Sequence, residues 1–265
     1  MYSSVQLAFK YFKYFLAASN GKGHGVHSPF VFDFITKVMN DSRHFYAFET
    51  IEKQRRRLMH DNALLTIEDF GAGSTVTKSN QRKVSNIAKS ALKPKKFGQL
   101  MFRMTDYYQA NTIVELGTSL GITTAYLASG NLKANVYTFE GAKQVAQIAR
   151  QNFEDLSLQN IQLLEGNFDE TLQPLLNKIE SVDFAFVDGN HRKEPTIRYF
   201  EQLLEKSTEQ SVFIFDDIHW SKEMEEAWNY IQQHEAVTLT IDLFFIGLVF
   251  FRREQKVSQH FVVRF

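Results

Sequence analysis

From Thr112 onward, the chain alternates short apolar runs with longer amphipathic segments. The apolar runs are rich in β-branched and aromatic residues, which is typical of strands that are buried on both faces. The segments between them repeat apolar residues at helical spacing. The expected strands are TIVEL, NVYTFE, IQLLEG, DFAFVDG and SVFIFDD. This alternation predicts an α/β fold in which helices cover both faces of a parallel sheet.

The two ends of the chain depart from this pattern. AVTLTIDLFFIGLVFFRR contains two apolar runs with only IG between them, which predicts an antiparallel hairpin at one edge of the sheet. QHFVVRF predicts one further strand. The start of the chain is instead mostly helical in pattern, with polar breaks. We therefore predict a helical N-terminal extension, or lid, over residues 1–96 and the sheet domain over residues 97–265.

Two glycine-containing loops compete as the cofactor-binding turn: IEDFGAGST, residues 67–75, and the loop within TIVELGTSLGITTAYLA, residues 112–128. The second lies between an expected strand and a helix start, where Gly117 and Gly121 would let the backbone approach a ligand. Glu140 ends the next expected strand, at a spacing suited to binding ribose hydroxyls. No strand ending in a carboxylate follows the first loop, so we expect it to be an ordered loop of the N-terminal region.

Composition narrows the function classes. Lysine plus arginine equal aspartate plus glutamate at 30 each, so we expect no nucleic-acid partner. The sequence has no cysteine, which excludes disulfides, zinc–thiolate sites and cysteine nucleophiles. No stretch approaches the roughly 20 apolar residues of a membrane span, and the signal-peptide layout is missing. We therefore expect a cytoplasmic protein without a transmembrane segment.

VELGTSLG, followed by FEG, GNFDETL and FVDGNH, resembles the motifs of class I methyltransferases that use S-adenosylmethionine. HGVHSPFVF and DFGAGS resemble segments of a bacterial methyltransferase-like group without clear substrates. The resemblance implies a Rossmann-like sheet with strand order 3-2-1-4-5-7-6 and strand 7 antiparallel, which fits the terminal hairpin. It makes residues 97–265 the S-adenosylmethionine-binding methyltransferase domain.

The resemblance also implies a set of cofactor-binding residues. The glycine loop would line the methionine part, Glu140 would hold the ribose, and the residues just past the third strand would border the adenine. Glu115 has the alternative of capping the turn, and Phe168 that of a core position. The implied set is Glu115, Gly117, Thr118, Ser119, Gly121, Glu140, Gly141, Asn167, Phe168 and Asp188.

Methyl transfer requires alignment of donor and acceptor, and usually deprotonation of the acceptor. Asp188, Asp216 and Asp217 follow two strands that are neighbours in the implied order, and their oxygens suit Mg²⁺ or another divalent cation. The arrangement is similar to that of catechol-type O-methyltransferases. His191 stands at the position of their lysine base, and histidine can act as a base near neutral pH. Alternatively, the aspartates fix turns or cap helices, and His191 and His219 are metal ligands or surface residues.

These features predict an O-methyltransferase that acts on a small hydroxylated acceptor, and a homodimer is compatible with them. We place four residues at the acceptor site: His24, His27, His219 and Trp220. For Ser28 and Pro29, the alternative is simply a helix start. Two other classes stay open, a non-catalytic cofactor-binding scaffold and a nicotinamide-dependent oxidoreductase. The second normally needs Tyr-x-x-x-Lys, and none of the ten tyrosines has a lysine four residues later.

Overall fold

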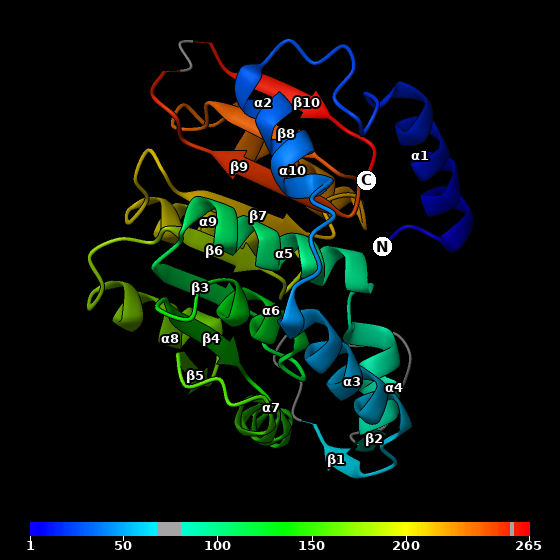
Figure 1. The fold of residues 1–265 in the computed structure, drawn as a ribbon, viewed down its shortest axis with the longest axis vertical. Coiled ribbons are helices and arrows are strands. Elements are labelled where there is room, and N and C mark those ends of the chain that lie inside the picture. Colours follow the sequence, from blue (N-terminus) through cyan, green and yellow to red (C-terminus); the bar gives the residue numbers. More distant parts are fainter. Residues whose placement is uncertain (68–80, 255–256) are drawn as a thin grey trace. The chain divides into compact units, whose positions relative to one another are not determined.

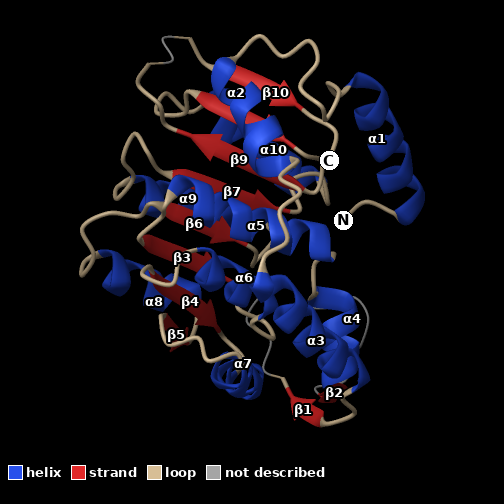
Figure 2. Ribbon diagram, viewed as in Figure 1, coloured by secondary structure: helices blue, strands red, loops and turns tan. Residues whose placement is uncertain are grey.

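The computed structural model describes residues 1–67, 81–254 and 257–265. The chain divides into two compact units: unit 1 contains Met1–Asp41 and Ile179–Phe265, and unit 2 is Ser42–Lys178. Eight strands, β3 to β10, belong to one mostly parallel sheet with accompanying helices (Figures 1 and 2). The predicted α/β class is thereby confirmed. The units are not divided at residue 96, and the functional division into 1–96 and 97–265 stays a prediction.

Unit 2 contains three parallel strands in the order β3-β4-β5. Their register places Glu115 beside Thr138, and Glu140 beside Glu165. Each strand leads into a helix, so the three connecting loops gather at the carboxyl edge of these strands. The order agrees with the 3-2-1 half of the predicted sheet. The elements are β3 (Thr112–Leu116), α6 (Ile122–Gly130), β4 (Asn135–Glu140), α7 (Lys143–Asp155), β5 (Ile161–Glu165) and α8 (Phe168–Leu176).

The first part of unit 2 is mostly helical, as its sequence pattern predicts. Its elements are α3 (Tyr46–His60), β1 (Leu64–Thr66), β2 (Gln81–Lys83), α4 (Val84–Ala91) and α5 (Lys95–Tyr108). Helix α5 packs closely on α6, because a Cβ at Gly98 would lie 2.4 Å from the Tyr126 ring. The Tyr126 hydroxyl donates a hydrogen bond of 2.8 Å to Glu52 of α3. The glycines of the first loop, residues 71–74, lie outside the described residues.

Unit 1 supplies the remaining strands in the order β6-β7-β9-β8-β10. Strand β9 is antiparallel to both β7 and β8, whereas β6 pairs in parallel with β7. This agrees with the 4-5-7-6 half of the predicted order, and the predicted terminal strand is present as β10, parallel to β8. The elements are β6 (Phe184–Val187), α9 (Lys193–Leu204), β7 (Val212–Asp216), α10 (Lys222–Gln233), β8 (Leu239–Asp242), β9 (Ile246–Phe250) and β10 (Gln259–Val262).

The predicted hairpin exists, but the position of its turn was wrong. The turn is formed by residues 243–245, and the IG pair belongs to strand β9. Gly247 is required by packing, since a Cβ there would lie 2.5 Å from the indole ring of Trp228 on α10. Phe244 adopts a positive φ of 70° in the turn, and its N–H donates to Asp242 Oδ1 at 2.7 Å. Apolar turn residues are hard to distinguish from strand residues by sequence pattern.

The N-terminal part of unit 1 lies at both the amino and the carboxyl ends of the strands of this unit. Its elements are α1 (Ser4–Ala17), α2 (Pro29–Asp33) and the π-helix η1 (Phe34–Met39). The predicted helix start is confirmed, because the Ser28 hydroxyl caps α2 and Pro29 occupies its first turn. Phe30 packs 4.9 Å from Phe250, which pairs with the first residue of β7, at the amino edge. Helix α1 lies at the carboxyl edge, beyond the ends of β7 and β10 (Figure 1).

Candidate functional site

The second glycine loop, in unit 2, has the conformation of a tight turn between a strand and a helix. Gly117, Ser119 and Gly121 all have positive φ angles, of 110°, 48° and 77°. The N–H groups of Gly117 and Thr118 donate to the Phe139 carbonyl at 3.1 and 3.0 Å, which holds the loop against the end of β4. Helix α6 begins immediately afterwards, so its first amides can serve a polar ligand.

Gly121 is explained by packing as well as by its backbone conformation. A Cβ at this position would lie 2.5 Å from the ring of Phe153 on α7, and the positive φ disfavours other residues. The contact with α7 therefore requires glycine here whether or not a ligand approaches. A cofactor-binding role for Gly121 stays a prediction.

Glu115, on β3, is a fully buried carboxylate. Thr138 donates to its Oε2 at 2.6 Å, and the Thr124 hydroxyl donates to the same oxygen. Among the described residues, Glu115 Oε1 has no hydrogen-bond partner. Burial raises the pKa of Glu115 to about 7, although the two threonine hydrogen bonds oppose the shift. Sequence reasoning missed both threonines; Thr138, within an expected buried strand, was the available signal. Contact of Glu115 with the methionine part stays a prediction.

Glu140, at the end of β4, connects the glycine loop to the start of α7. Its Oε2 accepts a hydrogen bond of 2.9 Å from Ser119 N–H, and its Oε1 accepts one of 2.9 Å from Ala142 N–H. The adjoining Gly141 is half-buried. Because each carboxylate oxygen has two lone pairs, Glu140 can accept further hydrogen bonds from a ribose. Its contact with Ser119 was not anticipated from the sequence.

The loop after β5 is tied to the same strand end. Gly166 N–H donates to the Glu140 carbonyl at 3.0 Å. Asn167 caps α8 by accepting from Asp169 N–H at 3.1 Å, and the Phe168 ring lies 6.4 Å from the Phe139 ring. Unit 2 therefore brings together the residues predicted for the ribose and for the adenine. Their binding roles stay predictions.

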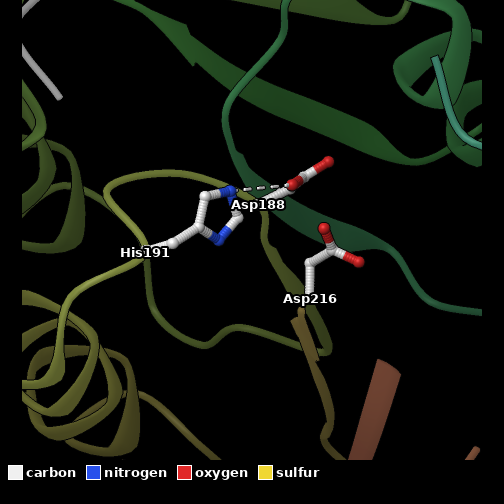
Figure 3. Close-up of side chains that lie close together, drawn as sticks. All are labelled: Asp188, His191 and Asp216. Carbon is white, nitrogen blue, oxygen red and sulfur yellow. Dashed lines mark ion pairs between the residues drawn. The ribbon is translucent and has the colours of Figure 1, made fainter. Parts of the chain in front are cut away.

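Unit 1 gathers three titratable side chains at the carboxyl ends of β6 and β7. One potential ligand atom from each of Asp188, His191 and Asp216 lies within 4.8 Å of the others. Figure 3 shows the His191 ring directed at the Asp188 carboxylate, with Asp216 beside them; the His191 Nε2 to Asp188 Oδ1 distance is 3.7 Å. Asp216 is fully buried. This arrangement can hold a divalent cation or move a proton.

Asp217 lies next to this group without belonging to it. Its φ is 54°, and its N–H donates to the Phe245 carbonyl at 2.7 Å. Its Oδ2 lies 4.0 Å from His191 Nε2. The three-residue group therefore contains His191 in place of Asp217, and metal binding by Asp217 stays a prediction. Trp220 lies close as well, with its ring 5.6 Å from that of His191.

His219 is held between two carboxylates. Its Nε2 lies 2.8 Å from Asp242 Oδ2, and its Nδ1 lies 3.1 Å from Glu225 Oε1. Burial lowers the pKa of His219, but the two carboxylates outweigh this effect and raise it above the usual value. Both ring nitrogens are thus engaged within the protein. A role in acceptor binding stays a prediction, and the structure gives it no support.

Glu225 also attaches helix α1 to the rest of unit 1. Lys10 Nζ lies 2.8 Å from Glu225 Oε1, and the Tyr2 hydroxyl donates to Glu225 Oε2 at 2.7 Å. Tyr2 N–H also donates to the Trp220 carbonyl at 3.1 Å. The α1 clasp, as we name it, fixes the loop that follows β7. It consists of Tyr2, Lys10, His219, Glu225 and Asp242.

His24 and His27 are exposed in the segment before α2. The nearby Phe30 packs at the amino edge of the strands, opposite to the edge that carries Asp188. This placement weighs against their predicted contact with the acceptor. That role stays a prediction.

Comparison with known proteins agrees with this architecture. Residues 114–218 match a methyltransferase domain family. Two curated relatives match short segments. A probable cobalt-precorrin-6B C(15)-methyltransferase (decarboxylating) of Sulfolobus acidocaldarius is 38% identical over 24% of this chain and 32% of its own length. A tRNA (guanine-N(7)-)-methyltransferase of Mycoplasma mobile is 31% identical over 29% of this chain and 39% of its own length. The chain thus spans about a third of the length of the first relative and about two fifths of the second.

Solved structures match over more of the chain. An O-methyltransferase from Bacillus cereus in complex with SAH has a TM-score of 0.57 at 21% identity, covering 79% of this chain and 92% of that one. The SAH-bound methyltransferase PaMTH1 of Podospora anserina has a TM-score of 0.58 at 13% identity, covering 85% and 97%. These similarities show the class I methyltransferase fold.

None of the described helices is long and apolar enough to cross a membrane.

Proposed function

We propose that this chain, which carries a methyltransferase domain in a class I fold, transfers a methyl group from S-adenosylmethionine to a hydroxyl of a small acceptor. One observation carries the cofactor assignment. Glu140 ends β4, and its carboxylate accepts a hydrogen bond from Ser119 in the glycine loop between β3 and α6. A strand-end carboxylate fixed beside such a loop suits the ribose of an adenosyl group.

The acceptor would be activated by the residues of unit 1. In this proposal, His191 accepts the proton of the acceptor hydroxyl, and Asp188 stabilises the resulting imidazolium from 3.7 Å. The hydroxyl oxygen then forms a bond to the methyl carbon as the carbon–sulfur bond breaks. The bonding electrons pass to the sulfonium, which leaves as the neutral thioether S-adenosylhomocysteine.

The Asp188–His191–Asp216 group also fits a divalent cation. It offers two carboxylates and an imidazole whose ligand atoms lie within 4.8 Å of one another. A bound cation would stabilise the acceptor oxyanion. A histidine ligand favours Mn²⁺ or another transition ion more than Mg²⁺, which prefers oxygen ligands. Because one nitrogen cannot hold a metal and a proton together, the metal-ligand role and the base role of His191 Nε2 exclude each other.

Calorimetry with S-adenosylmethionine and with NADH, each with and without Mg²⁺, tests the cofactor assignment. We expect the protein to bind S-adenosylmethionine and not NADH. In Glu140→Ala, the binding free energy of S-adenosylmethionine should be weaker by about 1–3 kcal/mol, because charge-assisted hydrogen bonds are lost. Glu154→Ala, an exposed glutamate of α7, is the matched control. Binding of NADH instead would replace the proposal with an oxidoreductase. Equal affinity in a folded Glu140→Ala variant would remove Glu140 from the site.

A further inference from the structure

Helix α1 presents a row of large apolar side chains to solvent. Val5, Phe9, Phe12 and Leu16 have 80%, 58%, 57% and 63% of their surface exposed. Their spacing of four, three and four residues places them on one stripe of the helix, as in a coiled-coil seam. Phe15, 45% exposed, flanks the stripe. Single exposed apolar residues are ordinary, whereas a contiguous stripe on one helix marks an interaction surface.

The opposite side of α1 packs against residues 179–265 of the same unit. Tyr14 is buried, its hydroxyl donates to the Val263 carbonyl, and its ring lies 5.2 Å from that of Phe244. Lys10 forms the ion pair with Glu225 in the α1 clasp. The helix therefore has a fixed inner side, and the apolar stripe faces outward as a consequence of specific contacts.

The size of the stripe fits the centre of a protein interface. Five side chains that are 45% to 80% exposed present on the order of 500 Å² of mostly apolar surface. A stable interface buries about 800 Å² per partner, with an apolar centre and a polar rim. The stripe can supply most of that centre, and the neighbouring surface of unit 1 can supply the rim.

We propose that the stripe pairs with α1 of a second copy of this chain, in an antiparallel arrangement. A two-fold interface requires a surface that is complementary to itself. The 4-3-4 spacing reads the same in both directions along the helix. An antiparallel pair thus places Phe9 against Phe12 of the second copy, and Val5 against Leu16 of the second copy.

The charges of α1 favour this occupant and this direction. The helix contains no acidic residue and two lysines, of which Lys10 is paired with Glu225. In the antiparallel register Lys13 lies opposite Ala8 of the second copy, whereas a parallel pair in register would bring Lys13 against its own counterpart. An anionic membrane surface would be attracted by several basic residues on the polar side of the helix. In α1, Lys13 is the one lysine without a carboxylate partner among the described residues, and its Nζ lies over the Phe9 ring, 4.6 Å from the ring centroid.

Analytical ultracentrifugation over a wide range of protein concentrations tests the pairing. We expect a dimer, with the dissociation constant raised roughly tenfold or more in Phe9→Glu and in Phe12→Glu. Leu132→Glu, a site 68% exposed between α6 and β4, is the control and should leave the dimer intact. A wild-type monomer at every concentration overturns the proposal, as does an unchanged dimer in both α1 variants. Co-flotation with phosphatidylglycerol vesicles, lost in the same variants, would assign the stripe to a membrane instead.

Introduced cysteines test the direction, because the natural sequence has none. An oxidised mixture of Val5→Cys and Leu16→Cys chains should form a mixed disulfide, and Val5→Cys alone should not. Efficient cross-linking of Val5→Cys with itself would contradict the antiparallel arrangement. None of these measurements depends on methyl transfer. The proposed pairing is therefore tested separately from the proposed activity.

Discussion

Thr138, on β4, donates a hydrogen bond of 2.6 Å to the buried carboxylate of Glu115 on the neighbouring strand β3. The Thr118 hydroxyl, in the glycine loop, lies 2.6 Å from that of Thr138. Because Thr138 uses its proton on Glu115, Thr118 must be the donor in this second bond. The charge state of a fully buried acid is thus coupled to the loop that we propose binds the cofactor.

Glu115 should make the folded state less stable as pH rises. Its pKa is about 7 in the folded chain, against 4.5 for an ordinary glutamate. Between these values the folded chain binds more protons than the unfolded chain, so stability falls from pH 4.5 to pH 7, by at most about 3 kcal/mol. In Glu115→Gln this contribution to the pH dependence should vanish. Urea unfolding across this range measures it, with the exposed Glu170→Gln as control. An identical pH dependence in wild type and Glu115→Gln would contradict the buried acid.

Gly247→Ala should destabilise unit 1 by about 1–3 kcal/mol, because the added methyl meets the Trp228 ring at 2.5 Å. Urea denaturation monitored by tryptophan fluorescence or circular dichroism measures the loss. Trp228→Leu removes the ring and creates space, so the double variant should lose less stability than the sum of the two single variants. Strict additivity would show that the two residues are not in contact.

Glu225→Gln should loosen helix α1, because it removes the charge that pairs with Lys10. We expect faster trypsin cleavage after Lys10 and Lys13, with cleavage elsewhere in the chain little changed. Glu226→Gln is the matched control, since its carboxylate pairs with Lys193 and Lys222 instead. Equal cleavage rates in the two variants would mean that the α1 clasp contributes little to holding the helix.

If the Asp188–His191–Asp216 group holds a metal, Mn²⁺ should bind to the wild-type chain and at least about tenfold more weakly to Asp188→Asn. Electron paramagnetic resonance of added Mn²⁺ measures this without an acceptor. EDTA should then abolish turnover and spare S-adenosylmethionine binding. Undiminished turnover in EDTA would exclude a metal from the mechanism and leave His191 as the base. In that case His191→Gln should lose activity.

The strands could be predicted because each depends on local sequence, whereas their order was implied by the resemblance to class I methyltransferases. The runs around Val114, Phe139 and Ile214 are mostly apolar, as strands with both faces buried require. The hairpin turn could not be placed in the same way. Its residues, 243–245, are apolar like those of the strands on either side, and the close contact of Gly247 with Trp228 joins residues distant in sequence.

The sequence predicts the positions of candidate site residues that end or follow strands. It does not predict contacts between residues that are far apart in the chain. Glu140, Asp188 and Asp216 follow or end apolar runs, so their positions could be predicted. The bond from Ser119 to Glu140 and the ion pair of Lys10 with Glu225 join residues far apart in the sequence. No periodicity or motif indicates such pairs.

The division of the chain into units implies an order of events during translation. Unit 2 is one continuous segment, so it can complete its internal contacts before residues 179–265 have all been synthesised. Helix α1 leaves the ribosome before unit 2, yet its contacts with Glu225 and Val263 become available only after unit 2 has been synthesised. Throughout that interval both sides of the helix are without their partners. The nascent chain therefore carries, ahead of unit 2, an aromatic segment that a chaperone is well suited to shield.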